Sequence, residues 1–214
     1  YIFFYSDHGG PFPRHKRAIY QTGTKVPFFI KFPKSLHAGE KDDRLLSFVD
    51  LAPSVLQIAG IEIPEYMQGK PISEFLHKRL RDYLITASDR FDGQYDRIRA
   101  IQDKRFKLIR SFYLDKSHHL NVHYRKNMPM MQKLLKLHVD GQLNQDQQKW
   151  FGLKEEYEFY DLQIDPYEMK NQIQNPDYQD HIQLLKVELE KWMLNTNDLG
   201  AVPEQVLIKQ ATSH

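Results

Sequence analysis

The stretch Tyr1-Ile2-Phe3-Phe4-Tyr5-Ser6-Asp7-His8-Gly9-Gly10 opens the chain and decides how the rest is interpreted. Its aromatic and β-branched start is typical of a buried β-strand. The polar and glycine residues that follow predict that the strand ends in a loop, and the apolar run at residues 26–32 predicts a second strand. Ligand sites in open α/β sheets lie beyond the carboxyl ends of strands. Asp7 and His8 are therefore candidate ligand-binding residues.

The remaining pattern predicts a helix and then a mixed second half. Residues 48–59 have apolar side chains at helical spacing, with Pro53 in the first turn. Further on, residues 84–87, 97–102, 105–112 and 157–162 predict strands, the middle two forming a hairpin, and residues 130–139 predict a helix. A final helix begins at Asn175, and its apolar face carries Ile182, Leu185, Leu189, Trp192 and Met193. We expect residues 1–75 to form the edge of a catalytic α/β sheet, and residues 76–214 an α+β subdomain with a small antiparallel sheet and a long C-terminal helix.

Composition excludes several classes of protein. The chain has 30 basic and 28 acidic residues, a net charge of +2, and no long run of one sign, which argues against a dedicated nucleic-acid binder. It has no cysteine, so it forms neither a disulfide nor a thiolate zinc site. No apolar run approaches the roughly 20 residues that span a bilayer. Because the chain starts inside a strand, without Met or leader, we expect a further region before Tyr1.

The loop after the first strand carries groups suited to binding an anion together with a metal. Asp7 offers oxygen to a hard cation, and His8 offers a ring nitrogen to a metal or a hydrogen bond to a substrate. Lys16 offers a point charge to an oxyanion. The alternative is a turn in which Asp and Gly serve only the backbone geometry.

Several blocks of the chain resemble one known family in the same order. Residues 5–9, then Lys16, Tyr20, Gly23 and Val26-Pro27, resemble the sulfatase pattern "SD(H/N)G … K … Y..G … VP". Further blocks resemble "DLAPTLLDLAG", "MQGKSL", "RDRMDERYDMVR … RYKYIRN" and "EELYDLEKDPYEXXNLA" at residues 48–60, 67–70, 88–110 and 158–171. The chain is thereby identified as resembling the C-terminal portion of a sulfatase, similar in particular to the heparan N-sulfatase branch and related bacterial sulfatases.

The resemblance implies an alkaline-phosphatase-like fold and hydrolysis of sulfate esters or N-sulfates, with a sulfated carbohydrate or other sulfate ester as substrate. It places Asp7 and His8 at a site for Ca²⁺, with Mg²⁺ as the alternative, and Lys16 as the catalytic cation on the sulfate. Because calcium prefers oxygen ligands, His8 keeps two open roles: metal ligand, or contact to the sulfate. Arg90 and Asp92 are implied near the substrate, or else form a structural ion pair.

One family motif is absent from the chain. Sulfatases make a formylglycine from Cys or Ser in "(C/S)XPXR", and this sequence has no such motif. We expect formylglycine in the preceding N-terminal region, packed against this chain, and expect the isolated chain to be inactive. A homo-oligomer is left open, and the family implies a periplasmic, secreted or lysosomal location.

Two other functions and two structural interpretations accompany this hypothesis. The alternatives are a phosphoester or phosphonate hydrolase of the same superfamily, and a non-catalytic carbohydrate-binding or interaction module. Hairpin alternation predicts that Lys104, Arg105 and Lys107 lie on a solvent-exposed face. We interpret His118, His119 and His123 as lacking a metal-site pattern, because no carboxylate accompanies them at helical spacing.

Overall fold

The structure is a computed structural model that describes residues 1–72 and 81–212. Its helices and strands are β1 Ile2–Tyr5, α1 Gln21–Thr24, β2 Phe28–Lys31, α2 Leu51–Ile58, β3 Leu84–Phe91, β4 Gln94–Gln102, β5 Phe106–Ser111, α3 His123–Lys126, α4 Pro129–Val139, α5 Gln145–Lys149, β6 Tyr157–Asp161, α6 Gln179–Asn195 and α7 Glu204–Thr212. The predicted boundary between residues 75 and 76 lies outside the described residues. No helix within the two described ranges is both long and apolar enough to cross a membrane.

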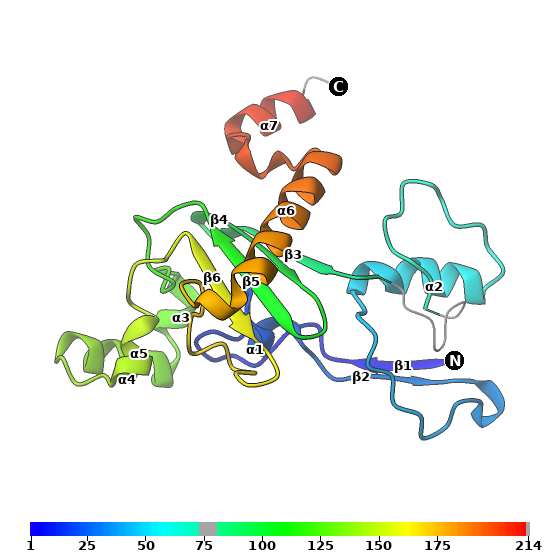
Figure 1. Cartoon of the computed structure of the whole chain (residues 1–214), viewed down its shortest axis with the longest axis horizontal. Coiled ribbons are helices and arrows are strands. Elements are labelled where there is room, and N and C mark those ends of the chain that lie inside the picture. Colours follow the sequence, from blue (N-terminus) through cyan, green and yellow to red (C-terminus); the bar gives the residue numbers. More distant parts are fainter. Residues whose placement is uncertain (73–80, 213–214) are drawn as a thin grey trace.

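A four-stranded antiparallel sheet, in the order β3-β4-β5-β6, forms the centre of the second half. Its register places Ile101 opposite Leu108, and Leu108 opposite Phe159. Helix α6 lies across this face (Figure 1), where its buried Leu185 and Leu189 pack against these side chains. The predicted strands and the predicted final helix are confirmed, because alternation on the strands and helical spacing on α6 direct their apolar groups to one core.

The opposite face of the sheet is covered by the loop after β1. Ile19 and Tyr20 of that loop pack against Ala100, Ile109 and Tyr160. Successive strand residues point to opposite faces, so these three sheet residues alternate with the ones that face α6. The sheet is therefore buried on both sides, by a helix on one and by an irregular loop on the other.

The prediction of an exposed hairpin face is wrong for Lys107. Lys107 lies two residues before Ile109 on β5 and therefore shares the face that the loop covers, and its side chain is 0% exposed. The side chains of Lys104 and Arg105, at and after the turn, are 55% and 46% exposed. Alternation alone does not reveal that a loop from another part of the chain covers the second face.

Strands β1 and β2 form a separate antiparallel pair, with Phe4 opposite Phe29. The predicted order of strand, loop and strand is confirmed. The prediction that the first strand is buried is wrong for the described chain, because Ile2 is 60% exposed and Phe4 is 66% exposed. Aromatic contacts run across the pair, as between Phe4 and Phe29, whose ring centres lie 6.0 Å apart. The pair is separate from the four-stranded sheet and lies on the side of the molecule where α2 is drawn (Figure 1).

Candidate functional site

The loop between β1 and β2 closes tightly on itself. The backbone N–H of Gly9 donates to the carbonyl of Gly23 at 3.0 Å, and that of Lys16 donates to the carbonyl of Gly10 at 3.0 Å. A Cβ atom at Gly9 would lie 1.9 Å from the carbonyl oxygen of Thr22, so glycine is required there by close packing. These bonds keep Asp7, His8 and Lys16 within one ordered loop.

Asp7 and His8 present to solvent two adjacent atoms of the kinds that can bind a metal. The Oδ2 atom of Asp7 lies 3.3 Å from Nε2 of His8, and the two side chains are 80% and 37% exposed. His8 Nδ1 lies 2.7 Å from the carbonyl oxygen of Gly9. A carbonyl only accepts, so Nδ1 carries the proton, and in the neutral ring Nε2 keeps its lone pair for a metal or a substrate.

These two side chains form a partial donor set for a cation. One carboxylate and one imidazole nitrogen can face the same ion, but calcium takes six to eight ligands, most of them oxygen. Within residues 1–72 and 81–212, no group of three or more His, Cys, Asp or Glu side chains could hold a metal. The described residues therefore offer two donor groups, fewer than a calcium site needs.

Lys16 is held in the loop through its backbone. Its N–H bonds to Gly10, and its carbonyl oxygen accepts from Nη2 of the buried Arg125 at 3.2 Å. Arg14 and Arg17, on either side, have left-handed φ angles of 62° and 63°. Such angles are unfavourable for residues with a Cβ and persist only where the surroundings impose them. The path of the backbone around Lys16 is thus imposed by its neighbours.

The structure links Asp92 to the loop and directs Arg90 elsewhere. The Nη1 atom of Arg17, the residue after Lys16, forms an ion pair with Asp92. Arg90 forms an ion pair with Glu204 at the start of α7, and its Nε atom donates to the carbonyl oxygen of Asp92 at 2.7 Å. Asp92 is therefore adjacent to the predicted sulfate-binding loop, whereas the charge of Arg90 is engaged by α7.

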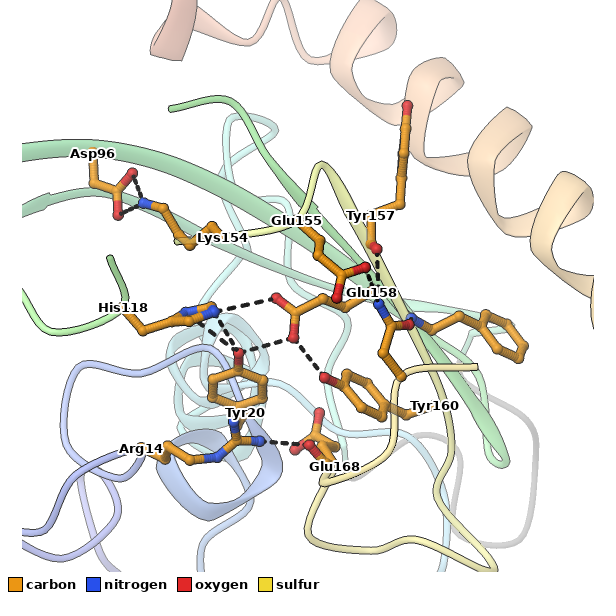
Figure 2. Close-up of polar contacts among 12 residues, drawn as sticks. Arg14, Tyr20, Asp96, His118, Lys154, Glu155, Tyr157, Glu158, Tyr160 and Glu168 are labelled. Carbon is orange, nitrogen blue, oxygen red and sulfur yellow. Dashed lines mark hydrogen bonds and ion pairs between the residues drawn. The ribbon is translucent and has the colours of Figure 1, made fainter. Parts of the chain in front are cut away.

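Under the loop lies a buried polar network (Figure 2). The hydroxyls of Tyr20 and Tyr160 both donate to Oε2 of Glu158, at 2.9 and 2.5 Å, and His118 Nε2 lies 3.8 Å from Oε1 of Glu158. Burial raises the pKa of both tyrosines, which remain protonated donors. Burial, with smaller contributions from Arg14 and Lys154, lowers the pKa of His118 to about 4. At neutral pH the imidazole is therefore uncharged.

A cavity of about 40 Å³ lies within this network, lined among others by Tyr20, Phe91, His118, Trp150 and Glu158. Pockets that take small organic ligands have volumes of about 300–1,000 Å³. The cavity is thus far too small for a sugar ring, and the exposed surface of the loop is the part of this region that a substrate can reach.

Comparisons with known proteins identify the family of the chain. Residues 10–148 match the family described as N-sulphoglucosamine sulphohydrolase, C-terminal. The chain belongs to this sulfatase family. An ulvan-active sulfatase of Formosa agariphila is 44% identical over 210 residues, covering 98% of this chain and 35% of its own length. The chain spans about a third of the length of these curated sulfatases that it matches.

Solved sulfatase structures share the fold. BT1596, a 2-O GAG sulfatase, superposes with a TM-score of 0.58 at 19% identity, covering 85% of this chain and 32% of its own. BT4656, in complex with its substrate D-glucosamine-2-N,6-O-disulfate, superposes with a TM-score of 0.56 at 23% identity, covering 86% of this chain and 32% of its own. These matches confirm the predicted α/β fold of a sulfatase C-terminal portion.

The buried side chains that bond to the loop between β1 and β2 were not predicted from the sequence. Lys107, Glu158 and Glu168 all form hydrogen bonds to this loop, and none was predicted at the site. One signal was available for Lys107, because it lies two residues from Ile109 in an apolar strand and must share its face. For Glu168, which follows β6 in an irregular segment, the sequence pattern gave no signal of burial.

Proposed function

We propose that this chain is the C-terminal part of a sulfatase that hydrolyses sulfate esters or N-sulfates of sulfated sugars. One observation carries the proposal: a single closed loop holds Asp7, His8 and Lys16, and the two metal-binding atoms lie 3.3 Å apart on its exposed side. The names of relatives support the substrate class, since one is ulvan-active and another was solved with glucosamine disulfate as its substrate.

Within this proposal each loop residue has a separate task. Asp7 is the oxygen ligand of a divalent cation, Ca²⁺ or Mg²⁺, and His8 Nε2 is either a second ligand or a donor to the sulfate when protonated. The cation supplies positive charge that polarises a sulfate oxygen. Lys16 places a second positive charge against the sulfate oxygens, where charge develops as the ester bond breaks. Asp92 would contact the sugar beside the loop, supported by its ion pair with Arg17, whereas the ion pair of Arg90 with Glu204 argues against a substrate contact for Arg90.

The remaining parts of the site would be supplied by the rest of the protein. The formylglycine nucleophile belongs there, and so do further metal ligands. The exposed aromatic faces of β1 and β2 support direct packing against that part, because Ile2, Phe4 and Phe29 are each at least 60% exposed. On this proposal the 214-residue chain by itself hydrolyses no sulfate ester.

An assay of the full-length protein tests the proposal. We would measure hydrolysis of an aryl sulfate and an aryl phosphate, with and without a chelator, for the wild type and for Asp7→Asn and Lys16→Ala. Matched controls are Asp115→Asn and Lys34→Ala, which change the same residue types at exposed positions away from the loop. We expect both loop variants to lose at least about a hundredfold in kcat/KM for the sulfate, as when one oxyanion-stabilising group is removed.

Three results would contradict parts of the proposal. Preference for the aryl phosphate would favour a phosphoester hydrolase, an alternative that the comparisons do not favour. Activity that survives the chelator would refute the metal role of Asp7. Absence of any hydrolysis by the full-length protein, with sulfated oligosaccharide still bound, would favour a non-catalytic carbohydrate-binding module.

A further inference from the structure

A buried ion pair connects the second half of the chain to the loop. Lys107 on β5 and Glu168 after β6 are both 0% exposed, and Nζ of Lys107 lies 2.8 Å from Oε1 of Glu168. We call these two residues the clamp. In most proteins a charge this deeply buried is found only with a partner, and a pair of apolar residues of similar volume would stabilise the fold as well or better. Stability alone does not account for the clamp.

Both charged side chains of the clamp also form hydrogen bonds to the backbone of the loop. Nζ of Lys107 donates to the carbonyl of Ile19 at 2.6 Å, and Oε2 of Glu168 accepts from the backbone N–H of Gln21. The carbonyl of Glu168 accepts from Nη2 of Arg14 at 2.6 Å, as Figure 2 shows for this pair. The clamp thus contacts the loop on both sides of Lys16.

The backbone on both sides of these contacts is strained. Glu168 has a φ angle of 56°, and Arg14 has one of 62°, although neither is glycine. Residues held in the left-handed region concentrate at functional sites, where the surrounding contacts impose the geometry. Arg14 and Glu168 bond to each other, and both have a strained backbone. This indicates that their contact fixes where the loop lies and does not merely bury it.

We propose that Lys107 and Glu168 are positioning residues that fix residues 14–21 and thereby hold Lys16 at the sulfate. Such a role presupposes the sulfate-binding function proposed above. Neither residue reaches the solvent-exposed side of the loop, so both act through its backbone. A displacement of a reacting group by about 1 Å can lower a rate about a hundredfold, which makes this backbone support relevant to catalysis.

One substitution removes a clamp contact without replacing either charged side chain. Gln21 is the first residue of α1, where proline is tolerated because its N–H has no partner within the helix. Tyr20 before it has φ −71° and ψ 162°, the extended conformation that a following proline requires. Gln21→Pro therefore deletes the N–H bond to Glu168 in a backbone already suited to proline. Gln21→Ala is the matched control, because both variants lose the side-chain bond to Gln102.

The experiment uses the full-length protein and two readouts. For Gln21→Pro we expect kcat for an aryl sulfate to fall about tenfold to a hundredfold with little change in KM, and the Lys16 amide to exchange hydrogen faster. For Gln21→Ala, which keeps the backbone N–H bond to Glu168, we expect both quantities to stay within about twofold of the wild type. A purely structural role would lower the unfolding temperature of Gln21→Pro without changing kcat of the folded enzyme.

A second pair of variants tests the proposal independently, in case Gln21→Pro folds poorly. Lys107→Met/Glu168→Leu removes both clamp charges, and Lys154→Met/Asp96→Leu removes another buried ion pair, which joins β4 to the segment before β6. We expect kcat to fall only in the first. If clamp variants keep the wild-type kcat and the wild-type Lys16 exchange, the positioning role is refuted and the sulfatase proposal stands. If the wild type hydrolyses no sulfate, both are refuted.

Discussion

His118 gives the molecule a stability that depends on pH. The imidazole is buried between Tyr20 and Glu158, stacks on Trp150 at a ring distance of 6.4 Å, and its pKa is about 4 in place of 6.5. The folded state therefore keeps the ring neutral, and unfolding takes up a proton at any pH between these values. The contribution of His118 to the free energy of unfolding is fully present above pH 6.5 and is lost as the pH falls toward 4. At about 1.4 kcal/mol for each pH unit, the loss between pH 7 and pH 4 is about 3 kcal/mol.

Replacing His118 by glutamine tests this value. We expect the wild type to lose about 3 kcal/mol more than His118→Gln between pH 7 and pH 4, because only the wild type has this ring to protonate. Urea unfolding at a series of pH values measures the difference, and carboxylates that titrate in the same range cancel between the two proteins. His123→Gln is the control, since His123 is exposed and should follow the wild type. Parallel curves for the wild type and His118→Gln would refute a neutral buried imidazole.

Two further predictions concern packing. Gly9→Ala should destabilise the loop by about 1–3 kcal/mol, because its Cβ would lie 1.9 Å from the carbonyl oxygen of Thr22. Gly93→Ala is the control, because a Cβ there would meet nothing within 4 Å. Urea unfolding compares the two variants, and equal stability would contradict the close approach at Gly9. Leu185→Ala should lower the free energy of unfolding by about 2–5 kcal/mol, because Leu185 packs against the sheet and is 1% exposed. Leu184→Ala should lower it by under about 0.5 kcal/mol, because Leu184 is 48% exposed. Similar losses at both positions would contradict the placement of α6.

The second half of the chain was predictable because its signals are local. Alternation identified the strands around Ile101 and Leu108, and helical spacing identified the buried face of α6 at Leu185 and Leu189. Each pattern depends on neighbours within a few residues. The motif at Asp7 and His8 was equally visible, since both residues lie together where a strand ends.

The support of the site was not predictable in the same way. Lys107 was assigned to solvent because one strand does not show what covers its second face, and that cover is Ile19, 88 residues away. Ile2 and Phe4 were predicted to be buried because the strand is aromatic and β-branched. Whether they are buried depends on another surface packing against them, and the strand itself carries no information about that surface. Long-range partners decide such cases, and periodicity carries no information about them.

The contact between Arg14 and Glu168 spans 154 residues and has a consequence for the order of events during synthesis. A ribosome adds about 5–20 residues each second, so roughly 10 to 30 s pass between the two ends of this contact. Throughout that interval the nascent chain carries Asp7, His8 and Lys16 on a loop whose contact with Glu168 has not yet formed. The loop therefore gains this contact only after residue 168 has been synthesised.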